Sequence, residues 1–217
     1  MNELYLGNCL DIMKSIPDQK IDLVLTDPPY GIGINKMSFA RGQQSGLAKR
    51  GDYRGMCDWD SQRIGPEFFK EMLRISKNQI IFGGNYYTDI LVPTKSWIVW
   101  DKKRQDKFHN DFADCELAWC SLGQARIFRY LWHGMIQQNM KEKEKRYHPT
   151  QKPVGLFRQI LEEYSQKGQL VCDPFMGVGS VGIACQELGR GFVGIEINQG
   201  YFDIANRRIN QTTENLL

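Results

Sequence analysis

The stretch LVCDPFMGVGS, residues 170–180, decides the fold. It opens with the apolar run Leu170 to Cys172, typical of a buried strand, and leads into a helix-like segment from Ser180 to Leu188. Glycines between a strand and a helix let the backbone approach a ligand closely, and the helix N-terminus favours a carboxylate or a phosphate. The stretch therefore predicts an α/β protein with a ligand site at the end of a strand.

The same alternation of strand and helix extends outward from this stretch. Further apolar runs typical of buried strands occupy residues 4–6, 21–26, 79–82, 96–100, 115–119 and 192–195, which makes seven candidate strands in all. Helix-like segments lie at residues 66–76, 153–166 and 201–209. Strands that alternate with helices indicate an α/β sheet covered by helices on both faces.

Length and composition predict one globular domain, residues 1–217. Of the 217 residues, 41% are hydrophobic and 24% are charged, which speaks against a disordered chain. No apolar run approaches the ~18 residues that span a bilayer, and the first residues lack a secretory pattern, so we expect a cytoplasmic protein with no membrane partner. The six cysteines are scattered without a CxxC pair, which predicts reduced thiols and no metal site.

Three polar segments, residues 31–65, 101–112 and 133–147, interrupt the α/β pattern and carry clusters of basic residues. A single run of positive charge is usually a solvated surface. Three basic loops in one small fold instead favour a polyanion such as DNA or RNA, although the net charge of +3 is too small to prove it. The candidate contacts are Lys36, Arg41, Lys49, Arg50, Arg54, Lys102 and Lys103.

A second motif, Thr26-Asp27-Pro28-Pro29-Tyr30, directly follows the strand candidate at residues 21–26. Prolines remove backbone donors and fix φ, which leaves their carbonyl oxygens free to accept hydrogen bonds. The Asp27 carboxylate and the Pro28 carbonyl would supply two acceptors beside the Tyr30 ring. An exocyclic amino group on a planar base has two N–H donors and a π face, so it fits this combination.

The glycines of the opening stretch continue to Gly182 and spell GxGxxG, and Glu196 follows at the end of the next strand candidate. A dinucleotide fold is one interpretation, because such a carboxylate can accept hydrogen bonds from ribose hydroxyls. However, Asp173 would repel a pyrophosphate, whereas it would attract the cationic amino group of a methionine moiety. S-adenosylmethionine therefore fits these residues better than NAD.

At these motifs the sequence resembles the DNA amino-methyltransferases, which use S-adenosylmethionine to methylate adenine N6 or cytosine N4. The matching pieces are residues 6–9, 27–30, 148–153, 173–180 and 194–196. Their order, with Asp-Pro-Pro-Tyr ahead of the glycine loop, is similar to the circularly permuted class called β. Residues 97–102 and 115–119 are also similar to small phage and prophage members. The resemblance implies a Rossmann-like, seven-stranded methyltransferase fold.

The resemblance also implies roles for single residues. Asp27, Pro28, Pro29 and Tyr30 would be catalytic, with Asp27 also near the cofactor. Many relatives carry Asp where Asn8 stands, but an amide oxygen can still accept a hydrogen bond. The implied cofactor-binding residues are Asn8, Cys9, Asp27, His148, Gln151, Lys152, Asp173, Pro174, Phe175, Gly177, Gly179, Ser180 and Glu196.

The sequence predicts methylation of adenine N6 in double-stranded DNA. Within the family, Asp at the first position of the tetrad, which is Asp27-Pro28-Pro29-Tyr30 here, favours adenine, and Ser favours cytosine. The alternatives are N4-cytosine methylation, a catalytically silent DNA-binding protein and an NAD-dependent oxidoreductase. Members of this class often pair, so the resemblance is also compatible with a homodimer. The recognised DNA sequence and the biological role, whether restriction–modification, evasion of phage defence or regulation, are not encoded in these motifs.

Overall fold

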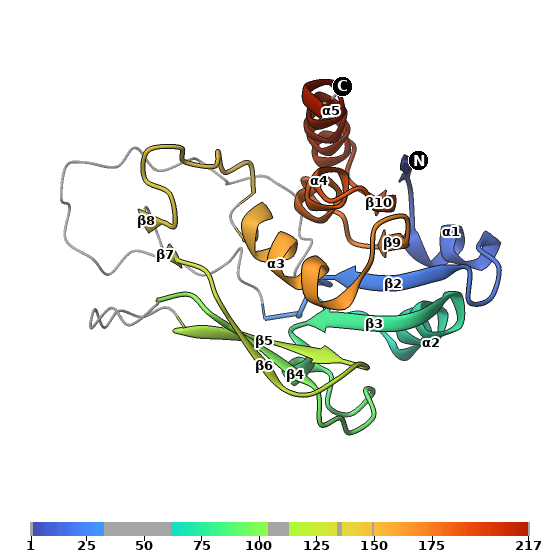
Figure 1. The fold of residues 1–217 in the computed structure, drawn as a ribbon. Coiled ribbons are helices and arrows are strands. Elements are labelled where there is room, and N and C mark those ends of the chain that lie inside the picture. The colour runs from blue at the N-terminus through green and yellow to red at the C-terminus, as the bar shows by residue number, and fades with distance from the viewer. Residues whose placement is uncertain (1, 33–61, 104–112, 134–135, 149, 217) are drawn as a thin grey trace.

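A mixed eight-stranded sheet forms the centre of the protein (Figure 1). The computed structural model describes residues 2–32, 62–103, 113–133, 136–148 and 150–216. All strands of the sheet run in one direction except β5. Across the sheet the order is β1 (Asn2–Leu6), β10 (Gly191–Glu196), β9 (Leu170–Asp173), β2 (Ile21–Thr26), β3 (Ser76–Phe82), β5 (Cys115–Cys120), β4 (Trp97–Asp101) and β6 (Arg126–Arg129).

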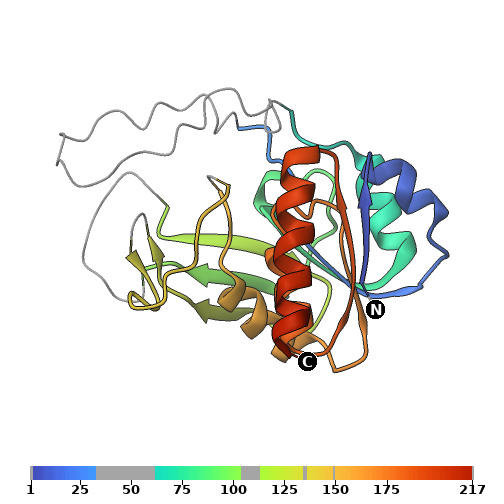
Figure 2. The same cartoon turned by 90° about the horizontal axis from the view of Figure 1, so that it is seen from above.

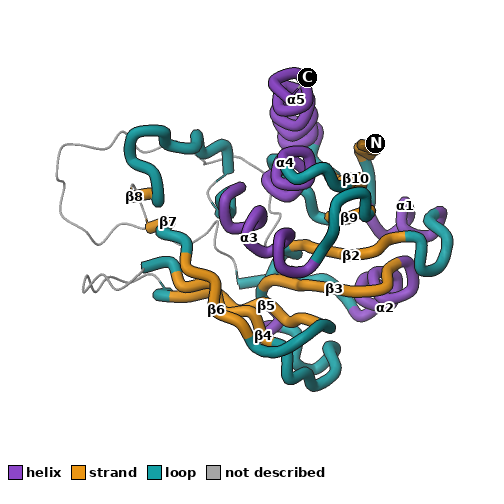
Figure 3. Tube along the Cα trace, in the orientation of Figure 1, coloured by secondary structure: helices purple, strands orange, loops and turns teal. Residues whose placement is uncertain are grey.

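Helices cover both faces of this sheet. Figure 1 shows α1 (Cys9–Ser15) and α2 (Pro66–Ile75) on one side, and α3 (Val154–Tyr164), α4 (Ser180–Glu187) and α5 (Gln199–Leu216) on the other. Helix α5 lies against β10, β1 and α4 (Figure 2). A short 3₁₀ turn, η2 (Gly84–Tyr86), follows β3. The small pair β7 (Trp132–His133) and β8 (Ile136–Gln137) lies apart from the large sheet (Figure 3).

The central strands are apolar on both faces because each face meets a layer of helices. In β2, Leu23 and Leu25 belong to the core shared with α3 and α4, whereas Val24 belongs to the core shared with α1 and α2. In β3, Phe82 and Ile81 divide in the same way. This two-sided burial fixes the strands, and so fixes which residues reach the carboxyl edge of the sheet.

All seven strands predicted from the sequence are present, but the prediction of a seven-stranded sheet misses β6. Its sequence is Arg-Ile-Phe-Arg, and three of its four residues are exposed because it forms an edge of the sheet. The helix α1 was also not predicted; it has only seven residues. The C-terminal helix extends well past the predicted residues 201–209, reaching Leu216.

Most of the predicted DNA-contacting segments 31–65 and 101–112 lie outside the described residues, as do Lys36, Arg41, Lys49, Arg50 and Arg54. Within the described ranges, no helix has the length and apolarity to cross a membrane. The five cysteines of that part of the chain are all free thiols. No cluster of His, Cys, Asp and Glu with the arrangement of a metal site occurs there either.

Candidate active site

Four neighbouring parallel strands bring the predicted site residues to one edge of the sheet. In the sheet order β1, β10, β9, β2, the strands end at or just before Asn8, Glu196, Asp173 and Asp27. Ligands of open α/β sheets bind at the carboxyl ends of the strands. Residues that lie up to 188 positions apart in the sequence thus form one row at this edge.

The glycine loop between β9 and α4 keeps space open at this edge. Gly177 has φ +54 and Gly179 has φ +82, conformations that favour glycine. A Cβ atom added at Gly177 would meet nothing within 4 Å, so its backbone faces open space. The Gly177 amide donates to Glu196 Oε2 at 2.8 Å, and the Asn198 amide donates to Oε1 at 2.8 Å. Backbone donors therefore fix the Glu196 carboxylate beside the loop.

Asp173 is a buried carboxylate that presents one oxygen to this space. Its Oδ1 accepts hydrogen bonds from Thr26 Oγ1 at 2.6 Å and from the Phe175 amide at 3.1 Å. No residue of the described chain donates to Oδ2. Burial raises the pKa of Asp173 to about 7, and the nearby Asp27 and Glu196 carboxylates add to this, against the lowering effect of its two hydrogen bonds. A cationic partner at Oδ2 would stabilise the charged form.

These groups fit S-adenosylmethionine chemically. The acceptor Asp173 Oδ2 suits an α-ammonium group, and each Glu196 oxygen retains a lone pair for a ribose hydroxyl. Ser180 Oγ is buried with no hydrogen-bond partner in the described part of the chain, so it also has capacity for a ligand. At the end of β1, Asn8 Oδ1 caps α1 by accepting from the Leu10 amide at 2.9 Å. Burial raises the pKa of the neighbouring Cys9 thiol to about 12, so it stays protonated.

On the β2 side, Asp27 lies in a chain of alternating charges. The Tyr30 hydroxyl donates to Asp27 Oδ1, and the Lys152 ammonium pairs with Oδ2. Lys152 Nζ also lies 3.1 Å from Glu116 Oε2, and Lys102 Nζ lies 2.8 Å from Glu116 Oε1. The Lys152 side chain is only 5% exposed but that of Asp27 is 26% exposed, so a ligand can reach Asp27.

The pKa values of this chain reflect burial and pairing together. Burial raises the pKa of Asp27 and the Lys152 ammonium opposes part of that rise. Burial also acts to raise the pKa of Glu116, but Lys152 and Lys102 together bring it below its ordinary value. The Tyr30 hydroxyl has a pKa raised well above its ordinary value by burial and by Asp27, so it remains a donor.

The Tyr30 ring packs against the turn that follows β3. Gly83 has φ +66, and a Cβ atom there would lie 2.0 Å from Tyr30 Cε1. Tyr86 stacks on Tyr30 with ring centroids 4.8 Å apart, and the Tyr87 hydroxyl donates to the Pro29 carbonyl. No described residue donates to the Pro28 carbonyl, and its predicted role as an acceptor for a substrate amine stays a prediction.

The segment that carries Lys152 is held by its own polar contacts. Gln151 donates to Glu144 Oε1 at 2.8 Å and accepts from the Tyr147 amide at 2.8 Å. His148 Nδ1 accepts from the Thr150 amide at 3.2 Å, and burial lowers the pKa of His148 to about 4, so the ring is neutral. In this structure Gln151 and His148 thus stabilise their own loop; their predicted contacts with a cofactor remain a prediction.

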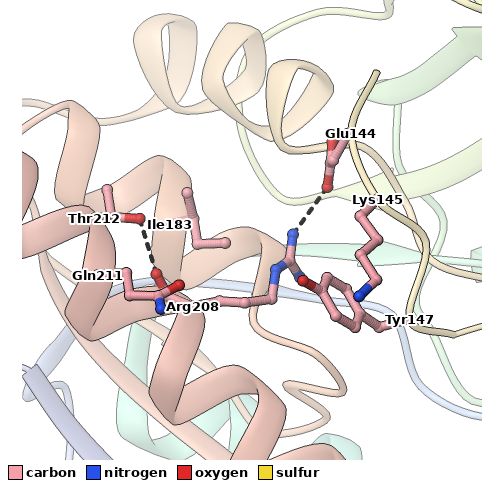
Figure 4. Close-up of a pocket in the computed structure, with 7 residues that line it drawn as sticks. All are labelled: Glu144, Lys145, Tyr147, Ile183, Arg208, Gln211 and Thr212. Carbon is pink, nitrogen blue, oxygen red and sulfur yellow. Dashed lines mark hydrogen bonds and ion pairs between the residues drawn. The ribbon is translucent and has the colours of Figure 1, made fainter. Parts of the chain in front are cut away.

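Arg208 of α5 ties this segment to the glycine loop (Figure 4). Its guanidinium donates to Glu144 Oε1 at 3.0 Å and to the Val178 carbonyl. It also lies over the Tyr147 ring, 5.2 Å from the centroid. Arg208 lines a cavity of about 280 Å³. Figure 4 shows its side chain extending toward Glu144 and Tyr147. One buried side chain therefore contacts both loops that border the site.

Several of these groups were not singled out from the sequence. They are Thr26 as a partner of Asp173, Glu116 as a partner of both Lys152 and Lys102, Gly83 as the residue against which the Tyr30 ring packs, and Glu144 with Arg208. Charged residues in apolar runs, such as Glu116 in Cys-Glu-Leu-Ala-Trp, were the available signal. The ammonium group of Lys152 contacts Asp27, Tyr30 and Glu116, and its predicted contact with a cofactor stays a prediction.

The two predicted DNA contacts inside the described residues are both paired with acids. Lys102 pairs with Glu116, and Lys103, whose side chain is 9% exposed, pairs with Asp114. A phosphate would have to compete with these ion pairs. The role of Lys102 and Lys103 in DNA binding therefore stays a prediction.

A glycine loop and several carboxylates thus meet at the carboxyl ends of the strands, which is where open α/β enzymes bind their ligands. The family model described as DNA methylase, N6_N4_Mtase, matches residues 69–207, more than half of the chain. The chain belongs to this family of DNA methylases.

Individual relatives agree with this membership. The Type II methyltransferase M.HinfI of Haemophilus influenzae is 28% identical, over 99% of this chain and 70% of its own. The M1.HpyAVI–SAM complex is structurally similar with a TM-score of 0.59 at 22% identity, covering 96% of this chain and 100% of that one. The PvuII DNA methyltransferase, described as cytosine-N4-specific, has a TM-score of 0.62 at 14% identity, covering 99% and 92%. The two structural matches show a shared fold.

Proposed function

We propose that this protein transfers a methyl group from S-adenosylmethionine to the exocyclic N6 amine of adenine at a specific sequence in double-stranded DNA. The observation that carries the proposal is the position of two acceptors, the Asp27 carboxylate and the Pro28 carbonyl. Both directly follow Thr26, whose hydroxyl donates to Asp173, and the charge of Asp27 contributes to the raised pKa of Asp173. An amine held by these acceptors is therefore next to the glycine loop.

The residues of the glycine-loop side would hold the cofactor. Asp173 would bind the α-ammonium group, Glu196 the ribose, and Asn8 with Cys9 the region of the adenine. Pro174, Phe175, Gly177, Gly179 and Ser180 would line the methionine end. When bound, S-adenosylmethionine supplies a sulfonium methyl group that the amine nitrogen takes as the carbon–sulfur bond breaks and leaves its electron pair on sulfur.

The tetrad supplies the remaining requirements of the reaction. The lone pair of an adenine amine is delocalised into the ring, so the nitrogen is a poor nucleophile. Asp27 and the Pro28 carbonyl can each accept one N–H, which lets the nitrogen pyramidalise, and Asp27 can accept the proton that is released. Fixing the reactants in line can contribute about 7–11 kcal/mol. The target must leave the duplex to reach this buried site, so base flipping is part of the proposal.

Adenine is proposed over cytosine because the first residue of the tetrad is an aspartate, Asp27. N4-cytosine methylation remains the alternative, since both amines offer the same two donors and a protein described as cytosine-N4-specific shares the fold. Membership of the DNA methylase family favours S-adenosylmethionine over NAD. The complete set of acceptors at Asp27, Asp173 and Glu196 favours a catalyst over a silent DNA-binding protein.

The setting of the reaction is also proposed. We expect a cytoplasmic enzyme of the permuted class, active as a monomer or a homodimer, and the relative named as a Type II methyltransferase favours a restriction–modification role. Reversing the charge of Lys49 and Arg50 together should weaken DNA binding and leave the affinity for S-adenosylmethionine unchanged. Unchanged DNA affinity would remove residues 31–65 from the interface.

The test is mass spectrometry of nucleosides from DNA incubated with the protein and S-adenosylmethionine. The variant Asp27→Ala is the active-site probe, and Asp89→Ala, at an exposed ion pair with Arg63, is the matched control. N6-methyladenine with the wild type and Asp89→Ala but not with Asp27→Ala supports the proposal. N4-methylcytosine would keep the mechanism and change the base. No methylated base on varied DNA, with cofactor binding intact, would favour the silent binder.

A further inference from the structure

Four charges alternate through the interior beside the tetrad: Asp27, Lys152, Glu116 and Lys102. They come from separate parts of the chain, namely the end of β2, the segment before α3, strand β5 and the end of β4. Two negative and two positive groups balance, so the row as a whole carries no net charge. Moving one ammonium within this row does not change that balance.

Lys152 has three N–H donors, and the structure accounts for two of them. One is directed to Asp27 and a second to the Tyr30 hydroxyl at 3.3 Å. Glu116 Oε2 lies 3.1 Å from Lys152 Nζ, yet it is buried and accepts no hydrogen bond from any described residue. A buried acceptor that is close but not aligned costs free energy unless some state of the protein uses it.

The present arrangement also occupies Asp27. Tyr30 donates to one oxygen and Lys152 pairs with the other, so a substrate amine that donates to Asp27 competes with the Lys152 ammonium. A displaced and unpaired buried ammonium would be strongly unfavourable. Glu116 Oε2 is the acceptor that can receive it, and a small rotation about the lysine side chain would align the two.

We propose that Glu116 is a positioning residue for methyl transfer, which takes up the ammonium group of Lys152 when the target amine binds to Asp27. The inference rests on the proposed function and deepens it. It explains how Asp27, whose two oxygens are occupied by Tyr30 and Lys152, becomes available to the substrate amine. Lys102 holds the other oxygen of Glu116 and so keeps Oε2 directed at Lys152.

The mechanism gives a direction for the effect of pH. The groups around Asp27 are Lys152 and Tyr30 in contact, Glu116 behind them with Lys102 beyond, and the Asp173 carboxylate on the glycine-loop side. The charge of Glu116 raises the pKa of Asp27, and Lys152 lowers it. In Glu116→Gln, the Lys152 ammonium has only Asp27 as an anionic partner. The pKa of Asp27 should therefore fall, and the acidic limb of the kcat–pH profile should move to lower pH.

The experiment measures methylation kinetics of Glu116→Gln beside Glu163→Gln, whose carboxylate is half exposed and lies 3.5 Å from Arg126. We expect kcat/KM for DNA to fall about tenfold in Glu116→Gln, with the Kd of S-adenosylmethionine within about twofold of the wild type. The acidic limb should move down by about half a pH unit. Glu163→Gln should match the wild type. An unchanged rate and an unchanged limb in Glu116→Gln would overturn the inference.

Two further variants separate charge from packing. Glu116→Asp keeps the charge, so its acidic limb should stay at the wild-type pH even if its rate falls. Lys102→Met removes a cation from the row, so its limb should move to higher pH. If Glu116→Gln no longer binds the cofactor, the test relies on Lys102→Met instead. An acidic limb of the kcat–pH profile that does not move in Lys102→Met would then overturn the inference. A wild-type protein that methylates no DNA would instead refute the proposed function.

Discussion

The ends of β1, β10 and β9 lie beside the ends of β2 and β3 in one sheet, yet the two regions hold their functional groups by different means. On the first side, which we call the glycine-loop half, backbone amides of the loop and of Asn198 fix Glu196. On the second, the Asp27 half, side chains from distant elements fix the carboxylate: Lys152 lies 125 residues from Asp27. Glu196 is therefore fixed by backbone amides, whereas Asp27 is fixed by long-range ion pairing.

This difference has consequences for ligand binding. In the glycine-loop half, backbone amides and the Thr26 hydroxyl are already in place as donors, and Asp173 Oδ2 has no described donor. In the Asp27 half both carboxylate oxygens have partners, and the ring of Tyr30 is stacked on Tyr86. We therefore expect the first half to bind its ligand without rearrangement and the second to exchange partners during each turnover.

The largest effect should come from Gly83→Ala, which disturbs the Asp27 half alone. The new methyl group would collide with the Tyr30 ring, since a Cβ atom there lies 2.0 Å from Tyr30 Cε1. Displacing Tyr30 also removes its hydrogen bond to Asp27. Methylation, measured as kcat/KM for DNA, should fall by about 100-fold or more because the nucleophile is no longer held in line. Calorimetry should find an unchanged affinity for S-adenosylmethionine.

Gly168→Ala is the matched control for this change. Gly168 also has a positive φ, +87, but a Cβ atom there would meet nothing within 4 Å. Both variants carry the backbone strain, about 1 kcal/mol, and only Gly83→Ala carries the collision. Equal activities of the two variants would mean that the position of Tyr30 does not matter for the reaction.

The second prediction concerns the glycine-loop half and its buried carboxylate. Asp173→Asn should weaken the binding of S-adenosylmethionine by about 10- to 100-fold at pH 8, the size of a lost charge-assisted hydrogen bond. Because the pKa of Asp173 is about 7, the wild-type affinity should fall as the pH drops below 7. Titration calorimetry between pH 6 and 8 should show this slope for the wild type and none for Asp173→Asn.

The same substitution should increase stability at high pH. The folded pKa of Asp173 lies above its ordinary value of 3.8, so the folded protein binds this proton more tightly than the unfolded chain does. That stabilising contribution is full at low pH and is lost as the pH rises to 7. At pH 8 the wild type contains a buried negative charge that the Asn side chain lacks. The free energy of unfolding of Asp173→Asn should therefore be ~2 kcal/mol higher than that of the wild type. A variant less stable than the wild type at pH 8 would contradict this.

The difference between the glycine-loop half and the Asp27 half also explains which parts of the site the sequence predicts. The glycine loop, Glu196 and the tetrad are short motifs next to apolar strands, so strand direction alone brings them to one edge. Glu116 is a charge in an apolar run, but the sequence does not reveal its partner, because Lys152 meets it only through the order of β3, β5 and β4 in the sheet. The edge strand β6 was missed for a related reason: three of its four residues face solvent. Groups fixed by distant packing need the structure.

The smallest expected effect tests whether the two halves are joined. Arg208 contacts the Val178 carbonyl of the glycine loop and Glu144 of the segment leading to Lys152, with a side chain only 10% exposed. Arg208→Met should lower the free energy of unfolding by about 2 kcal/mol, less than for a fully broken buried pair, because Glu144 keeps its bonds from Gln151 and Val154. Chemical denaturation measures this loss.

The comparison variant is Arg158→Met, since Arg158 is half exposed and lies 3.6 Å from Glu187. An exposed pair of this kind contributes about 0.5 kcal/mol or less. If Arg208 joins the halves, its loss should weaken cofactor affinity and DNA methylation by similar factors of about three, whereas Arg158→Met changes neither. A decrease confined to one of the two measurements would show that the glycine-loop half and the Asp27 half work independently, despite their common contact with this guanidinium.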